Sequence, residues 1–214
     1  MTSFTDVEFV VRTVAQTAVD NEKYFGELDS VVGDGDFGYS LARGFEIVLN
    51  DWDSYDRTDI STFLTKIAVA ITGRIGGTSG PIWGTAFLRA SAAVKGQTEI
   101  SGADAVAMLR SAITGIMARG NAELGDKTLL DALAPVTDTI EAGLAAGDDP
   151  GVIVSAAAAT ARAAADATTP MIAKRGRAAY TGERSIGSPD PGAVAVAVIL
   201  EAVASGWENR DAAD

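Results

Sequence analysis

Three aspartates, Asp29, Asp34 and Asp36, stand within eight residues of one another in the glycine-containing segment LDSVVGDGDFG. Carboxylates this close repel one another unless a cation lies between them. Glycine allows the backbone to bend so that they converge, and carboxylate oxygens are ligands that magnesium and calcium prefer. An EF-hand does not fit, because counting from Asp34 places Tyr39 at its glycine position and Phe45 at its glutamate position. The segment predicts a divalent-metal site, with a solvated acidic turn as the alternative.

Two further glycine segments have the composition of anion-binding loops. Residues 76–81, GGTSGP, place the hydroxyls of Thr78 and Ser79 before an apolar helical stretch, where they could bind phosphate or only cap the helix. Residues 120–128, GNAELGDKT, come close to a Walker A loop but have one residue too many and follow a helical stretch instead of a strand. We therefore reject a P-loop there, although the apolar residues from Leu129 to Leu133 could contact a base.

A fourth segment combines glycine with positive charge. Residues 173–192 contain four of the chain's 17 basic residues, Lys174, Arg175, Arg177 and Arg184, in a protein whose net charge is −12. Clustered cations beside glycines suit a polyphosphate. The alternative is a solvated basic loop that offsets the acidic surface.

The composition limits the chemistry that this chain can perform. It contains no cysteine and no histidine, which excludes disulfides, thiolate nucleophiles, Ser-His-Asp triads and zinc–histidine sites. Carboxylates, hydroxyls, basic side chains, backbone amides and a bound metal remain. Because 29 acidic residues repel a phosphate backbone, we expect no nucleic-acid partner.

We expect a cytoplasmic protein that does not cross a membrane. No run of about 18 apolar residues is free of both charge and glycine. The N-terminal residues MTSFTDVEF contain acids where a signal peptide has basic residues.

Apolar residues recur with helical spacing along most of the chain. Clear cases are Leu41–Trp52, Ile60–Ile71 and Val106–Met117, the last preceded by a capping-box-like pair, Ser101 and Asp104. Further helices fit residues 5–21, 78–96, 126–145, 150–173 and 191–206, and no useful stretch alternates with period two. We predict one all-α domain, residues 1–214, built as a bundle or closed barrel of about eight antiparallel amphipathic helices. The four glycine segments would gather at one end of it.

Taken together, the four segments resemble the nucleotide-binding L subunit of dihydroxyacetone kinases, which also occurs as the C-terminal domain of single-chain versions. The matching stretches are LDSVVGDGDFG, GGTSGPIWGTAF, RGNAELGDKTLLDALAPV and KRGRAAYTGERSIGSPDPGA. They follow the family's order and span nearly the whole chain. The resemblance implies a barrel of eight antiparallel helices with the nucleotide at one end.

The resemblance also implies roles for particular residues. Asp29, Asp34 and Asp36 would hold two magnesium ions that bridge the phosphates of ATP or ADP. The family's nucleotide-contacting positions match Phe37, Gly38, Tyr39, Ser40, Thr78, Ser79, Gly120, Leu129, Arg177, Asp190, Pro191 and Gly192. Among them, Thr78 and Ser79 would face phosphate, Leu129 the adenine, and Arg177 the phosphates as the catalytic residue.

The implied reaction is phosphoryl transfer from Mg-ATP to a small ketose. In this family the ketose is held through a histidine of a separate K subunit or domain, so a chain without histidine needs such a partner. A phosphotransferase protein that recharges bound ADP is the alternative donor. The resemblance also suggests a homodimer or a pairing with K subunits.

The chain departs from the family pattern at two positions. The family usually has GDGDHG where this chain has Phe37, and a histidine after GERSIG where it has Ser188. Neither change affects the metal aspartates, and another small ketose, such as a tetrulose, is an alternative substrate. Two other functions stay open: an Mg-ADP-loaded regulatory module without turnover, and the related domain of a fatty-acid kinase, which we rank last because that domain normally precedes others.

Overall fold

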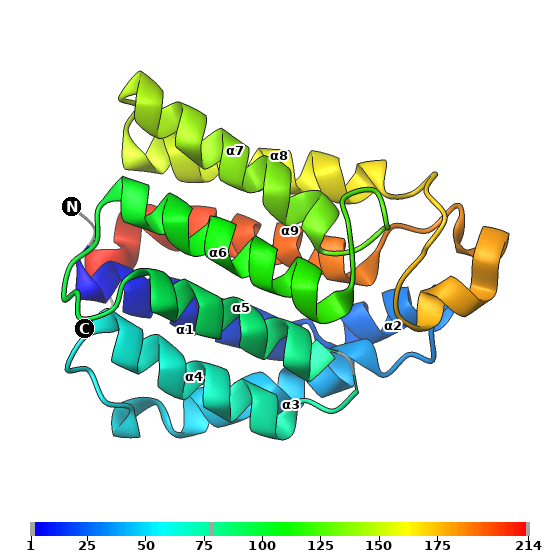
Figure 1. The fold of residues 1–214 in the computed structure, drawn as a ribbon, viewed down its shortest axis with the longest axis horizontal. Coiled ribbons are helices and arrows are strands. Elements are labelled where there is room, and N and C mark those ends of the chain that lie inside the picture. The colour runs from blue at the N-terminus through cyan, green and yellow to red at the C-terminus, as the bar shows by residue number, and fades with distance from the viewer. Residues whose placement is uncertain (1–2, 78, 213–214) are drawn as a thin grey trace.

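A computed structural model of the chain describes residues 3–77 and 79–212, and within these ranges it contains helices and no β-strand (Figure 1). The α-helices are α1 (Phe4–Asp20), α2 (Glu22–Val32), α3 (Phe37–Asn50), α4 (Ile60–Arg74), α5 (Ser79–Ala93), α6 (Gly102–Gly120), α7 (Leu130–Ala146), α8 (Pro150–Ala167) and α9 (Pro191–Gly206). Three 3-10 helices are η1 (Trp52–Ser54), η2 (Arg177–Ser185) and η3 (Trp207–Ala212). The predicted all-α class is confirmed.

Eight of the α-helices close into a ring. Each packs against the next in the order α1, α3, α4, α5, α6, α7, α8, α9, and α9 packs back against α1. Ring neighbours run in opposite directions, so α3, α5, α7 and α9 all begin at the end of the molecule opposite the termini (Figure 1). This is the predicted antiparallel barrel, and α2 is an additional helix at the end where those four helices begin.

Helix α9 contributes residues to two apolar clusters of the core. Ala195 and Ile199 belong to the apolar cluster shared with α1 and α3–α5, whereas Val194 and Ala197 belong to the cluster shared with α7 and α8. An 18-residue window within residues 191–210 has a mean hydropathy of 1.3, enough by length and composition for a membrane span. The burial of α9 between its neighbours accounts for this composition.

Local sequence explains where the helices begin. Ser101 and Asp104 form the predicted capping box of α6, with the Asp104 amide donating to the Ser101 hydroxyl at 3.1 Å and the Ser101 amide donating back to the Asp104 carboxylate at 2.8 Å. At α9, Asp190 accepts from the Ala193 amide at 2.7 Å, and Pro191 occupies the first helical position. That cap places the Asp190–Gly192 turn at the same end of the barrel as the acidic segment.

Several predicted boundaries were wrong. Residues 22–32, left without an element, form α2, so Asp29 lies in a helix instead of a loop. Only Phe25 and Val32 of α2 are buried, which leaves too few apolar positions for a periodic signal. Helix α7 begins at Leu130, not at 126, and α8 ends at Ala167, not at 173. Residues 123–128 and 168–176 instead make hydrogen bonds to each other and to Ser185 of η2.

Candidate functional site

One open cavity lies at the end of the barrel where α3, α5, α7 and α9 begin, and all four glycine segments contribute to its wall. The first segment provides Asp29, Asp34, Asp36, Phe37 and Ser40; the second Gly76, Gly77 and Ser79; the third Gly120 and residues 127–130; the fourth residues 175–178 and 190–192. The structure therefore brings together segments that are up to about 160 residues apart in the chain.

Four helix N-termini border this cavity. Phe37, Ser79, Leu130 and Pro191 are the first residues of α3, α5, α7 and α9, and each lines the wall. The first turn of an α-helix has unpaired amides and a partial positive charge. A cavity bordered by four such ends favours a multiply charged anion, even in a protein with a net charge of −12.

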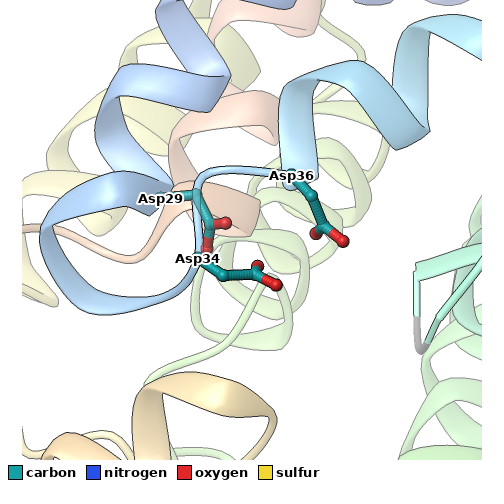
Figure 2. A group of neighbouring side chains, drawn as sticks. All are labelled: Asp29, Asp34 and Asp36. Atoms are coloured by element: carbon teal, nitrogen blue, oxygen red, sulfur yellow. The ribbon is translucent and has the colours of Figure 1, made fainter.

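The acidic cluster sits at the junction of α2 and α3. Asp29 is in the last turn of α2, Asp34 is in the connection, and Asp36 precedes the first turn of α3, with their carboxylates turned toward a shared space (Figure 2). One oxygen from each carboxylate lies within 4.8 Å of the others. Asp29 accepts the Gly35 amide at 2.9 Å and the Phe37 amide at 3.4 Å. Gly35 has a φ of +78°, a value that favours glycine and lets the connection fold back over Asp29.

The electrostatics of the cluster differ from one acid to the next. Partial burial, opposed by the two amide hydrogen bonds and assisted by the charges of Asp34 and Asp36, raises the pKa of Asp29. Hydrogen bonding from the Arg177 guanidinium lowers the pKa of Asp34. The side chains of Asp34 and Asp36 are about half exposed (51% and 50%), so their oxygens remain accessible to a ligand. Three convergent carboxylates with accessible oxygens fit a hard divalent cation such as magnesium.

Arg177 is the basic side chain that meets the acidic cluster. It is the first residue of η2, and its Nη1 atom pairs with Asp34 and, at 2.8 Å, with Asp36. These hydrogen bonds raise the pKa of Arg177 above its ordinary value. The guanidinium offsets the repulsion among the carboxylates and stands beside any group that they bind.

The other bases of the fourth segment have different positions. Arg175 also borders the cavity, but its Nε atom donates to Asp126 at 2.7 Å, and Lys174 pairs with the same carboxylate at 3.3 Å. Arg184 is exposed and lies outside the described cavity wall. The segment is therefore neither a simple polyphosphate cluster nor a simple solvated loop.

An apolar part of the wall was missed by sequence reasoning. Ile82, Trp83 and Ile116 line the cavity together with Leu129 and Leu130, which belong to the stretch Leu129–Leu133 that the sequence offered as apolar contacts for a base. Trp83 and Ile116 are buried, so their helical spacing gives the same signal as any core position.

Not every predicted nucleotide contact lies in the cavity. Gly38 and Tyr39 are absent from its described wall. A side chain at Gly38 would collide with the carbonyl oxygen of Glu22, so this glycine permits the close approach of α2 and α3. Tyr39 is 59% exposed, with its ring centre 5.2 Å from the guanidinium carbon of Arg43. Thr78 lies outside the described residues.

The two positions that depart from the expected motif both face inward. The Phe37 ring centre lies 6.0 Å from that of Phe25, and the backbone amide of Phe37 donates a hydrogen bond to Asp29. Ser188 is buried, and its carbonyl accepts from Lys127 at 2.7 Å. Both residues therefore contribute backbone contacts that do not depend on side-chain identity.

Asp190 connects the cavity to the segment before α9. Its carboxylate caps α9, and its amide donates to the Thr168 hydroxyl at 2.8 Å. Desolvation raises the pKa of Asp190 to about 7, although the Ala193 amide and the charge of Lys127 act in the opposite direction.

Comparison with known proteins places this geometry in context. The family described as the DAK2 domain matches residues 31–205. The ADP-binding subunit DhaL of the PEP-dependent dihydroxyacetone kinase of Escherichia coli (strain K12) is 35% identical over 182 residues, covering 85% of this chain and 87% of that protein. The L-erythrulose 1-kinase of Mycolicibacterium smegmatis is 36% identical over 199 residues, covering 91% of this chain and 34% of the kinase.

The fold is also that of a solved structure. The dihydroxyacetone kinase from C. freundii in complex with AMP-PNP and Mg²⁺ superimposes with a TM-score of 0.75 and 26% identity. The match covers 94% of this chain and 33% of the kinase chain.

Proposed function

Because the chain belongs to the DAK2 domain family, we propose that it is the nucleotide-binding subunit of a dihydroxyacetone-type kinase. In this proposal it holds a magnesium–nucleotide complex in the barrel-end cavity and presents a phosphoryl group to a small ketose. A separate K subunit binds that ketose.

The observation that carries the proposal is the convergence of two opposite electrostatic features in one cavity. Three carboxylates lie within 4.8 Å of one another at the same barrel end at which four helices begin. Carboxylates suit a cation, whereas helix N-termini suit an anion. A polyphosphate bound through a divalent metal satisfies both.

The proposal assigns a task to each part of the wall. Asp29, Asp34 and Asp36 hold magnesium, which when bound neutralises charge on the phosphates. Arg177 contacts the transferring phosphoryl group, since its guanidinium already lies against two of these carboxylates. Ser79 and Gly120, with Thr78 from the sequence pattern, contact phosphate. Leu129 packs against the base, supported by the apolar wall that includes Trp83.

The cavity binds only one of the two substrates in this proposal. A ketone site built on an imidazole requires a histidine, and the chain has none. The erythrulose kinase relative is about three times as long as the shared region, since this chain covers 34% of it. We therefore assign ketose binding to a partner subunit, and we extend the substrate class to tetruloses as well as dihydroxyacetone.

The test is a reconstitution with three components. The purified chain, a ketose-binding K subunit and Mg-ATP are incubated with dihydroxyacetone or erythrulose, and the phosphorylated ketose is measured. We expect product that depends on both proteins and disappears with Asp34→Ala. Absence of product with either ketose, or an unchanged rate with Asp34→Ala, would contradict the proposal.

The same assay identifies the phosphoryl donor. The E. coli relative is described as PEP-dependent and ADP-binding. One arm therefore replaces ATP with PEP and phosphotransferase proteins in the presence of protein-bound ADP. Product from this arm alone identifies a carrier that is recharged in place, whereas product from ATP alone identifies exchange with solution. Tight Mg-ADP binding without product in either arm would support a regulatory module instead.

A further inference from the structure

Lys127, in the third glycine segment, is buried and fully hydrogen-bonded. It is 2% exposed, and its ammonium donates to the main-chain carbonyls of Met171 (3.1 Å), Ser188 (2.7 Å) and Ser185. An ammonium has three N–H donors, so these carbonyls use all of them. Lys127 occupies the lysine position of a segment that resembles a phosphate-binding loop. Its ammonium nevertheless donates to carbonyls of the protein itself.

The three carbonyls lie on both sides of the segment that carries Arg177. Met171 comes before η2, whereas Ser185 ends it and Ser188 follows it. One ammonium therefore connects the residues just before η2 with those at its end and just after it. The amide of Ala173 donates to the Ser185 hydroxyl at 2.9 Å and so also connects the two sides of the segment.

The preceding residue holds the same segment at a second point. The buried Asp126 carboxylate accepts Arg175 Nε at 2.7 Å and pairs with Lys174 at 3.3 Å, and its carbonyl accepts the Lys174 amide at 3.0 Å. Arg175 is two residues before Arg177. The dipeptide Asp126–Lys127 thus contacts the segment from two directions.

This arrangement has a cost that ordinary packing does not explain. Lys127 has a φ of +61°, in the left-handed region that residues other than glycine rarely adopt. Burial also lowers its pKa, because the charged ammonium loses water. A neutral side chain would avoid the loss of hydration, so the charge is retained for the three contacts that it makes.

We propose that Lys127 is the positioning residue for Arg177: by joining both sides of segment 171–188 to the third glycine segment, it fixes the guanidinium over the acidic cluster. Lys127 borders the cavity, but its three N–H donors already bind main-chain carbonyls, so it acts through Arg177 and not by donating to the nucleotide. The inference rests on the proposed function, because it concerns how the cavity binds Mg-ADP.

A double-mutant cycle in the full chain tests this role. The dissociation constant of Mg-ADP is measured by calorimetry for the wild type, Lys127→Met, Arg177→Ala and the double variant. We expect Lys127→Met to weaken binding by about tenfold in the wild-type background and by less than about twofold in the Arg177→Ala background, since interacting residues are not additive. An equal factor in both backgrounds, or no effect in the wild type, would overturn the proposal.

Limited trypsin digestion gives a second readout that does not depend on nucleotide. The segment contains the cleavage sites Lys174, Arg175, Arg177 and Arg184. We expect faster cleavage there in Lys127→Met, because the segment loses the three hydrogen bonds that connect its two sides and opens more often. Cleavage at the wild-type rate would overturn the proposed anchoring.

Two further variants guard against a simple loss of folding. Asp126→Asn loosens the same segment from its other contact and should show the same coupling to Arg177→Ala with a smaller factor. Asp6→Asn removes another largely buried acid, which pairs with Arg210. Asp6 is in the first turn of α1, and the chain termini lie at the end of the barrel opposite the starts of α3, α5, α7 and α9 (Figure 1). It should lower the unfolding temperature and leave Mg-ADP affinity unchanged. Reduced affinity in Asp6→Asn would attribute the effect of Lys127→Met to stability and overturn the proposal.

The outcomes separate the two levels of the inference. If the wild type does not bind Mg-ADP, the proposed function fails, and trypsin digestion still decides whether Lys127 anchors the segment. If the wild type binds Mg-ADP and the cycle is additive, only the positioning role fails.

Discussion

The acidic segment at residues 29–36 and the basic segment at residues 173–192 look alike in sequence, since each gathers charge among glycines, but the fold uses them differently. Asp34 and Asp36 are half exposed and turned toward the cavity. In the basic segment, Lys174 and Arg175 are held by the buried Asp126, and Arg177 alone among its four bases pairs with the acidic cluster in the described structure. Charge density in a sequence therefore identifies a segment, whereas nearby buried acceptors decide which charges remain for a ligand.

The largest effect is expected from the exposed acids. Asp34→Asn removes one negative charge with little change in shape and should weaken Mg-ADP binding by about 100-fold or more, because the proposed magnesium site loses one carboxylate ligand. Calorimetry in the presence of magnesium measures this. Glu27→Gln, a change at an exposed acid of α2, is the matched control and should have no effect. Equal losses in both variants would attribute the result to net charge and remove the distinction between the segments.

Arg177→Ala should have effects of opposite sign on two ligands. Mg-ADP should bind about tenfold more weakly, because a charge-assisted contact to phosphate is lost. Manganese without nucleotide should bind more tightly, because the guanidinium no longer competes for Asp34 and Asp36. Electron paramagnetic resonance of free manganese measures the second effect, and Arg184→Ala is the control. Weaker manganese binding in Arg177→Ala would refute the competition.

Asp126→Asn tests the idea that part of the basic segment serves the fold. Burial of Asp126 acts to raise its pKa, but hydrogen bonds from the Glu123 amide, Arg175 and Lys174 together lower it. A lowered folded-state pKa means that the ionised acid stabilises the protein above about pH 4, and that this contribution is lost as the pH falls through the folded-state pKa.

We expect the free energy of unfolding of this variant to be about 1 kcal/mol lower than that of the wild type at pH 7. The value is modest because both partner bases are partly exposed. The difference from the wild type should shrink below about pH 4. Urea denaturation across this pH range measures both. A difference that grows toward low pH would contradict the assignment.

The smallest effect on binding is expected at Phe37. Its amide donates to Asp29, and a histidine keeps that donor, so Phe37→His should change Mg-ADP affinity by less than about threefold. The protein should lose about 1 kcal/mol of stability, because a histidine buries less apolar surface against Phe25. A tenfold change in affinity would show that the ring, and not only the backbone, contributes to the acidic segment's function.

The sequence predicted the parts of the molecule that depend on local pattern. Apolar periodicity identified eight helices of the barrel, and glycine beside Asp34 and Asp36 identified the acidic segment. Helix α2 was not predicted because only two of its residues, Phe25 and Val32, are buried, so it shows no apolar periodicity. The role of Lys127 could not be predicted either, because its three partners are main-chain carbonyls 44 to 61 residues away. Every residue has such a carbonyl, so the sequence does not show which ones accept a hydrogen bond.

Binding of ADP with and without metal tests the central claim most directly. ADP is titrated into the purified chain by calorimetry, after removal of any co-purified nucleotide, once with magnesium and once with EDTA. We predict saturable binding at one site with magnesium and loss of that binding in EDTA, because the carboxylates of Asp29, Asp34 and Asp36 repel phosphate unless a cation joins them. Equal binding in both titrations, or none with magnesium, would contradict the claim that this cavity is a magnesium–nucleotide site.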